Sequence, residues 1–227
     1  QRLHVIPHCA ASRCAFIDTL AGTTVVETLW NESVPAVAPA TAFVSHVWTQ
    51  PFDALLSTLD EYMLSVPLDK RAGVYFWIDI FCVDPYASAT FASSEWSDTF
   101  SKMVASIGHT LLVCVPALTP KALSRCWCIY ELHCTLQNGC ALTVGTPNSE
   151  AERAFGSRNT VSERQSSYEA AIASLEALDS EAAKATYQHD KERIDNAIVA
   201  AGGFEVIDKA VRSRLLAELL ARILERG

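Results

Sequence analysis

The chain has 227 residues, half of them hydrophobic, and is long enough to fold around a substantial core. Its formal charge of -8 and the lack of a basic stripe argue against a nucleic-acid partner. No run approaches the roughly 20 apolar residues of a membrane span, so no membrane association is expected. Eight cysteines without a recognisable signal peptide predict reduced thiols and a cytoplasmic protein.

The composition changes near residue 150. The first 150 residues hold 7 Lys and Arg and 13 Asp and Glu, whereas the last 77 hold 11 and 13. This contrast predicts an α/β core over 41–150 and a helical extension over 151–227 that packs on the core. Residues 1–40 form an N-terminal extension, in which 23–29 is a candidate edge strand and 35–40 a candidate linker.

Within the core, strand-length apolar runs alternate with amphipathic stretches, a pattern typical of parallel βα units. A helix is expected to begin near Pro120 or Ser124 and to run to about Gln137, where Asn138-Gly139 provides a stop. Beyond residue 160 the pattern is helical, and its apolar stripe favours core packing over a membrane or partner helix. The other predicted elements are strands at 41–46, 74–79, 110–115 and 141–144 and a helix at 51–66.

Glu131 is the only acid in the apolar and aromatic segment 124–132. Trp127 and Cys128 precede it by four and three residues, so they share its face of the predicted helix. A carboxyl group beside an indole and a thiol is partly desolvated, which tends to raise its pKa and strengthens its field on a bound molecule. The alternative is a structural ion pair between Glu131 and Arg125.

Polar side chains also follow the first two predicted core strands. Ligands of open α/β sheets bind at the carboxyl ends of the strands, so these side chains are candidates for one site. For His46 the alternative is a buried, hydrogen-bonded histidine, and for Asp79 it is a cap or loop-ordering residue. The candidates are Ser45, His46 and Trp48 after the first strand, and Asp79, Phe81 and Cys82 after the second.

Other chemistries have weaker support in the sequence. The paired short spacings of structural zinc sites are absent, so no metal is expected. A nucleophilic Cys/His pair is a further alternative. Its possible members in the core are Cys82, Cys128, His46 and His109, but the sequence does not show which of them lie together. No glycine-rich phosphate loop is present, which argues against a P-loop NTPase or an ordinary dehydrogenase. The possible zinc ligands are His4, His8, Cys9, Cys14, Cys126 and Cys128.

Three motifs resemble the TIR (Toll/interleukin-1 receptor) superfamily: Phe43-Val-Ser-His46, Phe76-Trp-Ile-Asp79 and Leu123-Ser-Arg-Cys-Trp-Cys-Ile-Tyr-Glu-Leu132. The chain is more closely similar to TIR-like domains of algae, oomycetes and other protists, which are often fused to tetratricopeptide or NTPase modules. These share a Trp-x-x-x-Phe helix, here within 95–100, and an Ile-Gly-x-Thr strand entry, here 107–110. The first-strand pattern of animal and plant TIR domains is not reproduced beyond Phe-x-Ser, and their signalling loop has no clear counterpart after Asp84.

The resemblance implies a flavodoxin-like parallel sheet and, in catalytic members, cleavage of the nicotinamide–ribose bond of NAD+. The chain would then be an NAD+ glycohydrolase or ADP-ribosyl cyclase in signalling or cell-death defence. It would have NAD+ or a related nucleotide as substrate, no prosthetic cofactor, and activity that depends on self-association. A non-catalytic scaffold of the same fold is the alternative, and an unrelated enzyme on this scaffold is a third possibility. The resemblance makes Glu131 catalytic and assigns substrate binding to Ser45, His46, Trp48, Asp79, Phe81, Trp127 and Cys128.

Overall fold

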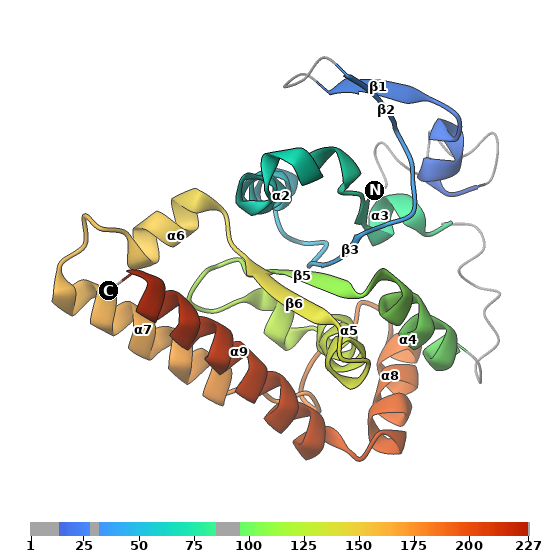
Figure 1. Cartoon of the computed structure of the whole chain (residues 1–227). Helices are drawn as coiled ribbons and strands as arrows, with labels where there is room; N and C mark the ends of the chain where they lie inside the picture. Colours follow the sequence, from blue (N-terminus) through green and yellow to red (C-terminus); the bar gives the residue numbers. More distant parts are fainter. Residues whose placement is uncertain (1–13, 28–31, 85–95, 227) are drawn as a thin grey trace.

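The computed structural model describes residues 14–27, 32–84 and 96–226. Its centre is a sheet of four parallel strands in the order β4-β3-β5-β6 (Figure 1). The first core strand thus lies between the second and the third, as in flavodoxin-like proteins. The expected flavodoxin-like α/β fold is therefore confirmed. The strands are β3 (Ala42–Ser45), β4 (Phe76–Trp77), β5 (His109–Val113) and β6 (Ala141–Gly145).

The central strands β3 and β5 are buried on both faces. All four residues of β3 are buried, and so are the last four of β5. Alternate side chains join two apolar clusters, with Phe43 and Leu112 on one side and Val44 and Leu111 on the other. This two-sided burial explains why these segments read as continuous apolar runs instead of an alternating pattern.

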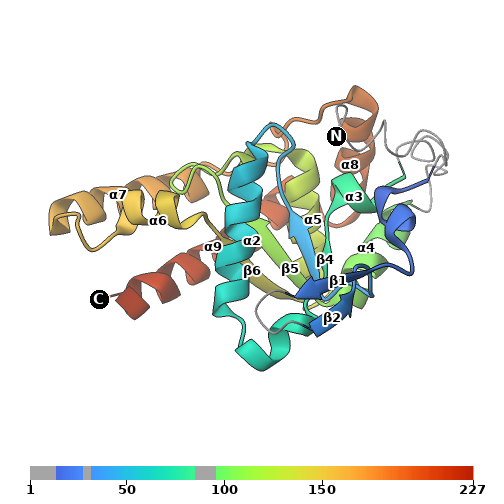
Figure 2. The ribbon, with the colours of Figure 1, turned by 90° about the horizontal axis from the view of Figure 1, so that it is seen from above.

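Helices cover both faces of the sheet (Figures 1 and 2). One face carries α2 (Phe52–Ser65), and the other carries α4 (Trp96–Ile107) and α5 (Cys126–Gln137). Gly145 allows α2 to lie close to β6, because a Cβ atom there would meet Thr58 Cγ2 at 2.5 Å. The predicted stop of α5 is observed, since Gly139 follows the helix with φ of 63°.

The C-terminal helices pack on the core, mainly through α5. The outer side of α5 meets α8 (Gln188–Ala200) and α9 (Phe204–Arg226), while α6 (Asn148–Phe155) and α7 (Val161–Glu176) lie beyond the β6 end of the sheet. α5 is therefore enclosed between the sheet and two helices, which explains its apolar sequence. The buried side chains of the extension include Ile194, Ile198, Ile207 and Val211. No helix within the described ranges is long and apolar enough to cross a membrane.

Two predicted strands differ from the structure. Only Phe76–Trp77 of the predicted strand 74–79 pairs with β3, and Asp79–Cys82 forms the short helix α3. The Asp79 carboxylate accepts the Ile80 N–H at 2.6 Å, which favours a helix start over an extended strand. Within the described part of the segment 23–29, β1 (Thr24–Glu27) pairs antiparallel with β2 (Glu32–Pro35) in a sheet separate from the four-stranded one. Short 3-10 helices span Phe16–Leu20, Leu68–Gly73 and Lys121–Ser124.

Candidate functional site

The fold brings Ser45 and Glu131 together although 86 residues separate them. Ser45 is the last residue of β3 and is fully buried, and its Oγ donates a hydrogen bond of 2.6 Å to Glu131 Oε2. Glu131 lies in the second turn of α5 and is only partly exposed. The one carboxyl group of α5 is thus directed at the carboxyl end of a central strand, where ligands of such sheets bind.

Asp79 organises the loop that follows β3. Its carboxylate receives a hydrogen bond from Trp48 Nε1 at 2.5 Å and pairs with His46 Nε2 at 2.9 Å. The His46 side chain is 6% exposed, whereas Trp48 is 54% exposed. These contacts agree with the structural alternatives given for both residues, because the His46 side chain is buried and hydrogen-bonded and Asp79 orders a loop. The contacts do not exclude a role in ligand binding. The same arrangement presents the Trp48 ring to solvent beside the strand ends.

Cys128 connects α5 to this loop. Its thiol donates to the His46 carbonyl oxygen at 3.5 Å. Burial raises the pKa of Cys128 well above that of a free thiol, and the nearby Glu131 carboxyl raises it further. Burial also raises the pKa of Cys82. Because a nucleophilic cysteine needs a lowered pKa, these thiols do not support the Cys/His interpretation.

The surroundings of Glu131 shift its titration strongly. Burial raises the pKa of Glu131 to about 8, the Ser45 hydrogen bond opposes the rise, and the Asp79 carboxylate adds to it. Within the described ranges, no basic side chain is among the groups that set this pKa. The predicted alternative of an ion pair with Arg125 is wrong in this structure, because the Arg125 guanidinium donates to Thr186 Oγ1 at 2.7 Å. Because no basic side chain in the described ranges offsets Glu131, a positively charged ligand would favour its ionised form.

The two remaining aromatic candidates lie in separate ring clusters. Phe81 packs against Phe16 at 5.6 Å and Phe52 at 6.2 Å between ring centroids, so it joins α3 to the N-terminal segment and to α2. Trp127 lies 6.0 Å from Phe100 of α4. Their assignment to a substrate pocket rests on the motif resemblance.

Gln50 is a further candidate residue that the sequence interpretation missed. Its Nε2 donates to the Val115 carbonyl oxygen and so joins the loop after β3 to the loop after β5. These two loops flank the point where the strand order reverses, which is the usual ligand crevice of such sheets. An amide side chain two residues after Trp48, just before the Pro51 that precedes α2, was the available signal.

Metal ligands are not assembled in the described ranges 14–27, 32–84 and 96–226, where no group of three His, Cys, Asp or Glu could hold an ion. Three of the possible zinc ligands, His4, His8 and Cys9, lie outside the described residues.

Replacing Ser45 by Ala is expected to raise the pKa of Glu131 further. The substitution removes the one hydrogen bond that favours the ionised carboxylate. It is also expected to destabilise the fold by about 1–3 kcal/mol, because a buried acceptor loses its donor. Carboxyl carbon chemical shifts followed through a pH titration, with Glu131→Gln to assign the signal, measure the change. An unchanged or lower midpoint would contradict the proposed role of the Ser45 hydroxyl.

A comparison with family models, with curated proteins and with solved structures finds no match to this chain. The function is therefore inferred from the geometry of the site and from the motif resemblance.

Proposed function

We propose that the chain cleaves the nicotinamide–ribose bond of NAD+, with Glu131 as the catalytic carboxylate. The observation that carries this proposal is the position of the Glu131 carboxyl group at the end of β3, where it accepts a hydrogen bond from Ser45. The Asp79 carboxylate raises the pKa of Glu131, and no basic side chain within the described ranges lowers it. The nicotinamide ring of NAD+ carries a positive charge, which the ionised form of Glu131 would complement. NAD+ or a related nucleotide is the expected ligand.

One catalytic carboxylate is sufficient for this reaction. Water and NAD+ give nicotinamide, ADP-ribose and a proton. Nicotinamide leaves as a neutral molecule because its ring nitrogen takes the electron pair of the broken C–N bond. An ordinary glycosidase needs a second carboxyl group to protonate its leaving oxygen, whereas this leaving group needs no proton. Ionised Glu131 would hold a ribose hydroxyl and stabilise the oxocarbenium-like transition state. Attack by an adenine nitrogen instead of water would give a cyclic product.

The neighbouring residues have binding and positioning roles in this proposal. Ser45 would orient Glu131, and the exposed Trp48 ring would stack on the nicotinamide, held by its bond to Asp79. His46 and Cys128 would fix the loop that forms this end of the pocket. Phe81 and Trp127 would contribute apolar walls. The reaction needs no prosthetic cofactor.

A scaffold function is the second candidate, and exposed apolar side chains favour it. Trp48, Phe52 and Leu56 are each about half exposed, and Phe52 and Leu56 lie four residues apart on one face of α2. Apolar groups exposed beside a site favour association with another protein or a second copy. We propose that self-association through this face accompanies activity, in a signalling or cell-death role.

Nicotinamide release from NAD+ tests the enzymatic proposal. The wild-type chain is assayed dilute and concentrated, beside Glu131→Gln, which keeps the shape of the side chain but removes its charge. We expect wild-type turnover that increases with concentration and a loss of about 100-fold or more in the variant, because the transition-state charge loses its partner. Glu176→Gln, at an exposed position that ends α7, is the matched control. If the folded wild type releases no nicotinamide even when concentrated, the scaffold function replaces the enzymatic one.

A further inference from the structure

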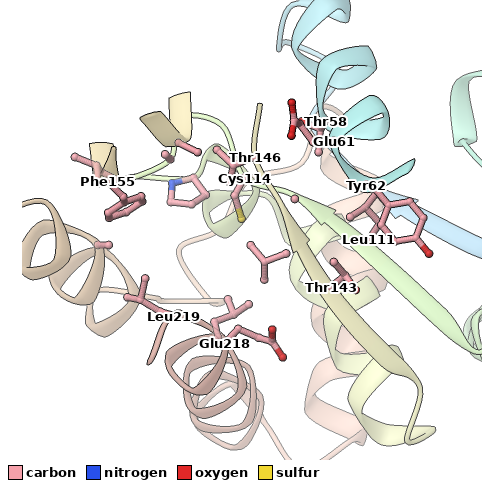
Figure 3. A pocket seen from close by; sticks show the side chains of 18 of the residues that line it. Thr58, Glu61, Tyr62, Leu111, Cys114, Thr143, Thr146, Phe155, Glu218 and Leu219 are labelled. Carbon is pink, nitrogen blue, oxygen red and sulfur yellow. The ribbon is translucent and has the colours of Figure 1, made fainter. Parts of the chain in front are cut away.

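A second concave surface lies away from Glu131, along the outer edge of β6. It has a cavity of about 380 Å³ between α2 and α9, with α6 and α7 at one end (Figure 3). None of Ser45, Asp79 and Glu131 lines it. A volume of this size lies in the usual range for ligand sites, so the groove requires its own explanation.

The backbone of β6 offers hydrogen-bonding groups to this groove. The Ala141 N–H and the Gly145 carbonyl both bond to the segment of β5, so these residues face the sheet. Successive residues of a strand direct their backbone N–H and C=O groups to opposite edges. The backbone groups of Leu142 and Val144 therefore point away from β5, toward the groove. Arg214 Nη2 donates to the Leu142 carbonyl at 3.4 Å. In the part of the chain that the structure describes, no strand pairs with Val144 on the outer side.

The walls of the groove are apolar and acidic. Glu61 of α2 and Glu218 of α9 lie on opposite walls, and Tyr62, Phe155 and Leu219 supply aromatic and aliphatic surface (Figure 3). Glu218 is paired with Arg214 at 2.6 Å, whereas Glu61 forms no ion pair with any residue that the structure describes. Of the described residues that line the cavity, none is Lys or Arg. The groove therefore combines the outward backbone groups of Val144 on an edge strand, apolar surface and an excess of negative charge.

We propose that this groove binds an extended, basic peptide segment of a partner protein, which adds a fifth strand beside β6. Strand addition uses main-chain hydrogen bonds for affinity and pockets for alternate side chains for specificity. The incoming backbone would pair with Val144, its apolar side chains would enter the cavity, and a Lys or Arg would lie near Glu61. The net charge of -8 adds long-range attraction for such a segment.

Fluorescence anisotropy with a defined probe tests the proposal. The probe is a labelled eight-residue peptide in which Val and Lys alternate. Two matched peptides accompany it, one with Glu in place of Lys and one with alternate backbone amides N-methylated. We expect saturable binding of the Val/Lys peptide, and binding weaker by about tenfold or more for each matched peptide, a difference of about 1.4 kcal/mol. Absence of Val/Lys binding, or equal binding by either matched peptide, would overturn strand addition.

Two variants locate the binding. Val144→Pro removes the outward N–H, a change tolerated on edge strands, and Val144→Thr keeps the N–H as its control. Glu61→Gln removes the unpaired charge. We expect Val144→Pro and Glu61→Gln each to weaken binding several-fold, and Val144→Thr to leave it within about twofold. In the wild type, bound peptide should slow hydrogen exchange at the Val144 amide, a readout that does not depend on the folding of Val144→Pro. Full affinity in Glu61→Gln or unchanged exchange at Val144 would overturn the proposal.

Discussion

Replacing Glu131 by Gln is expected to stabilise the protein at alkaline pH. Burial raises the pKa of Glu131 to about 8, against an ordinary value of 4.5, so the folded state holds the proton more tightly than the unfolded state. The stabilisation from this proton is fully present below the pKa that Glu131 has in the unfolded state. It is lost as the pH rises through the pKa that Glu131 has in the folded state. Between these two values the free energy of unfolding falls by about 1.4 kcal/mol per pH unit from this group alone.

Glutamine lacks this titration and keeps an oxygen that can accept from Ser45. The variant should therefore come close to the wild type near pH 5 and exceed it above pH 8 by roughly 3–4 kcal/mol, on the order of several hundredfold in the unfolding equilibrium. Urea denaturation of both proteins from pH 5 to pH 9, analysed as the difference in free energy of unfolding, measures the effect.

Glu176→Gln is the matched control for that titration, because it changes the same functional group at an exposed position. Its difference from the wild type should show no comparable increase with pH. A difference between Glu131→Gln and the wild type that stays constant from pH 5 to pH 9 would contradict the buried, proton-retaining state of Glu131.

The sequence marked the two halves of this site separately, and only the motif resemblance placed Glu131 together with Ser45. Apolar runs located β3, β5 and β6, and the single acid in the apolar segment of α5 marked Glu131 as unusual. Parallel strands end at one edge of the sheet, so the convergence of Ser45, His46 and Asp79 could be expected from the strand limits. The order of the strands makes β3 central, which explains its complete burial.

Other features depend on tertiary contacts that no local pattern contains. The side chain of Asp79 ends β4 early by bonding its neighbour's N–H, and it also holds His46 and Trp48. Phe81 shares the apolar character of the strand before it, but its neighbours come from the N-terminal segment and α2. Strand propensity identified a strand within 23–29, but propensity does not specify which strand is its partner.

The pH dependence of NAD+ cleavage follows from the same carboxyl group. If ionised Glu131 stabilises the transition state, only the deprotonated enzyme is active, and this fraction rises with pH through about 8. We expect kcat/KM to fall by about tenfold per pH unit below this midpoint, because kcat/KM reports the free enzyme. Initial rates of nicotinamide release, corrected for the uncatalysed hydrolysis at each pH, provide the profile.

The profile of kcat should bend at a lower pH than that of kcat/KM. A bound pyridinium places a positive charge beside Glu131 and favours its carboxylate, so the pKa of Glu131 falls in the complex. Ser45→Ala should move the kcat/KM midpoint to higher pH, since it removes the hydrogen bond that opposes the rise. A flat kcat/KM between pH 6 and pH 8 would show that Glu131 ionisation does not control the reaction. A kcat/KM that decreases with pH would assign the active form to the protonated carboxyl, and Glu131 would then donate a hydrogen bond instead of stabilising a cation.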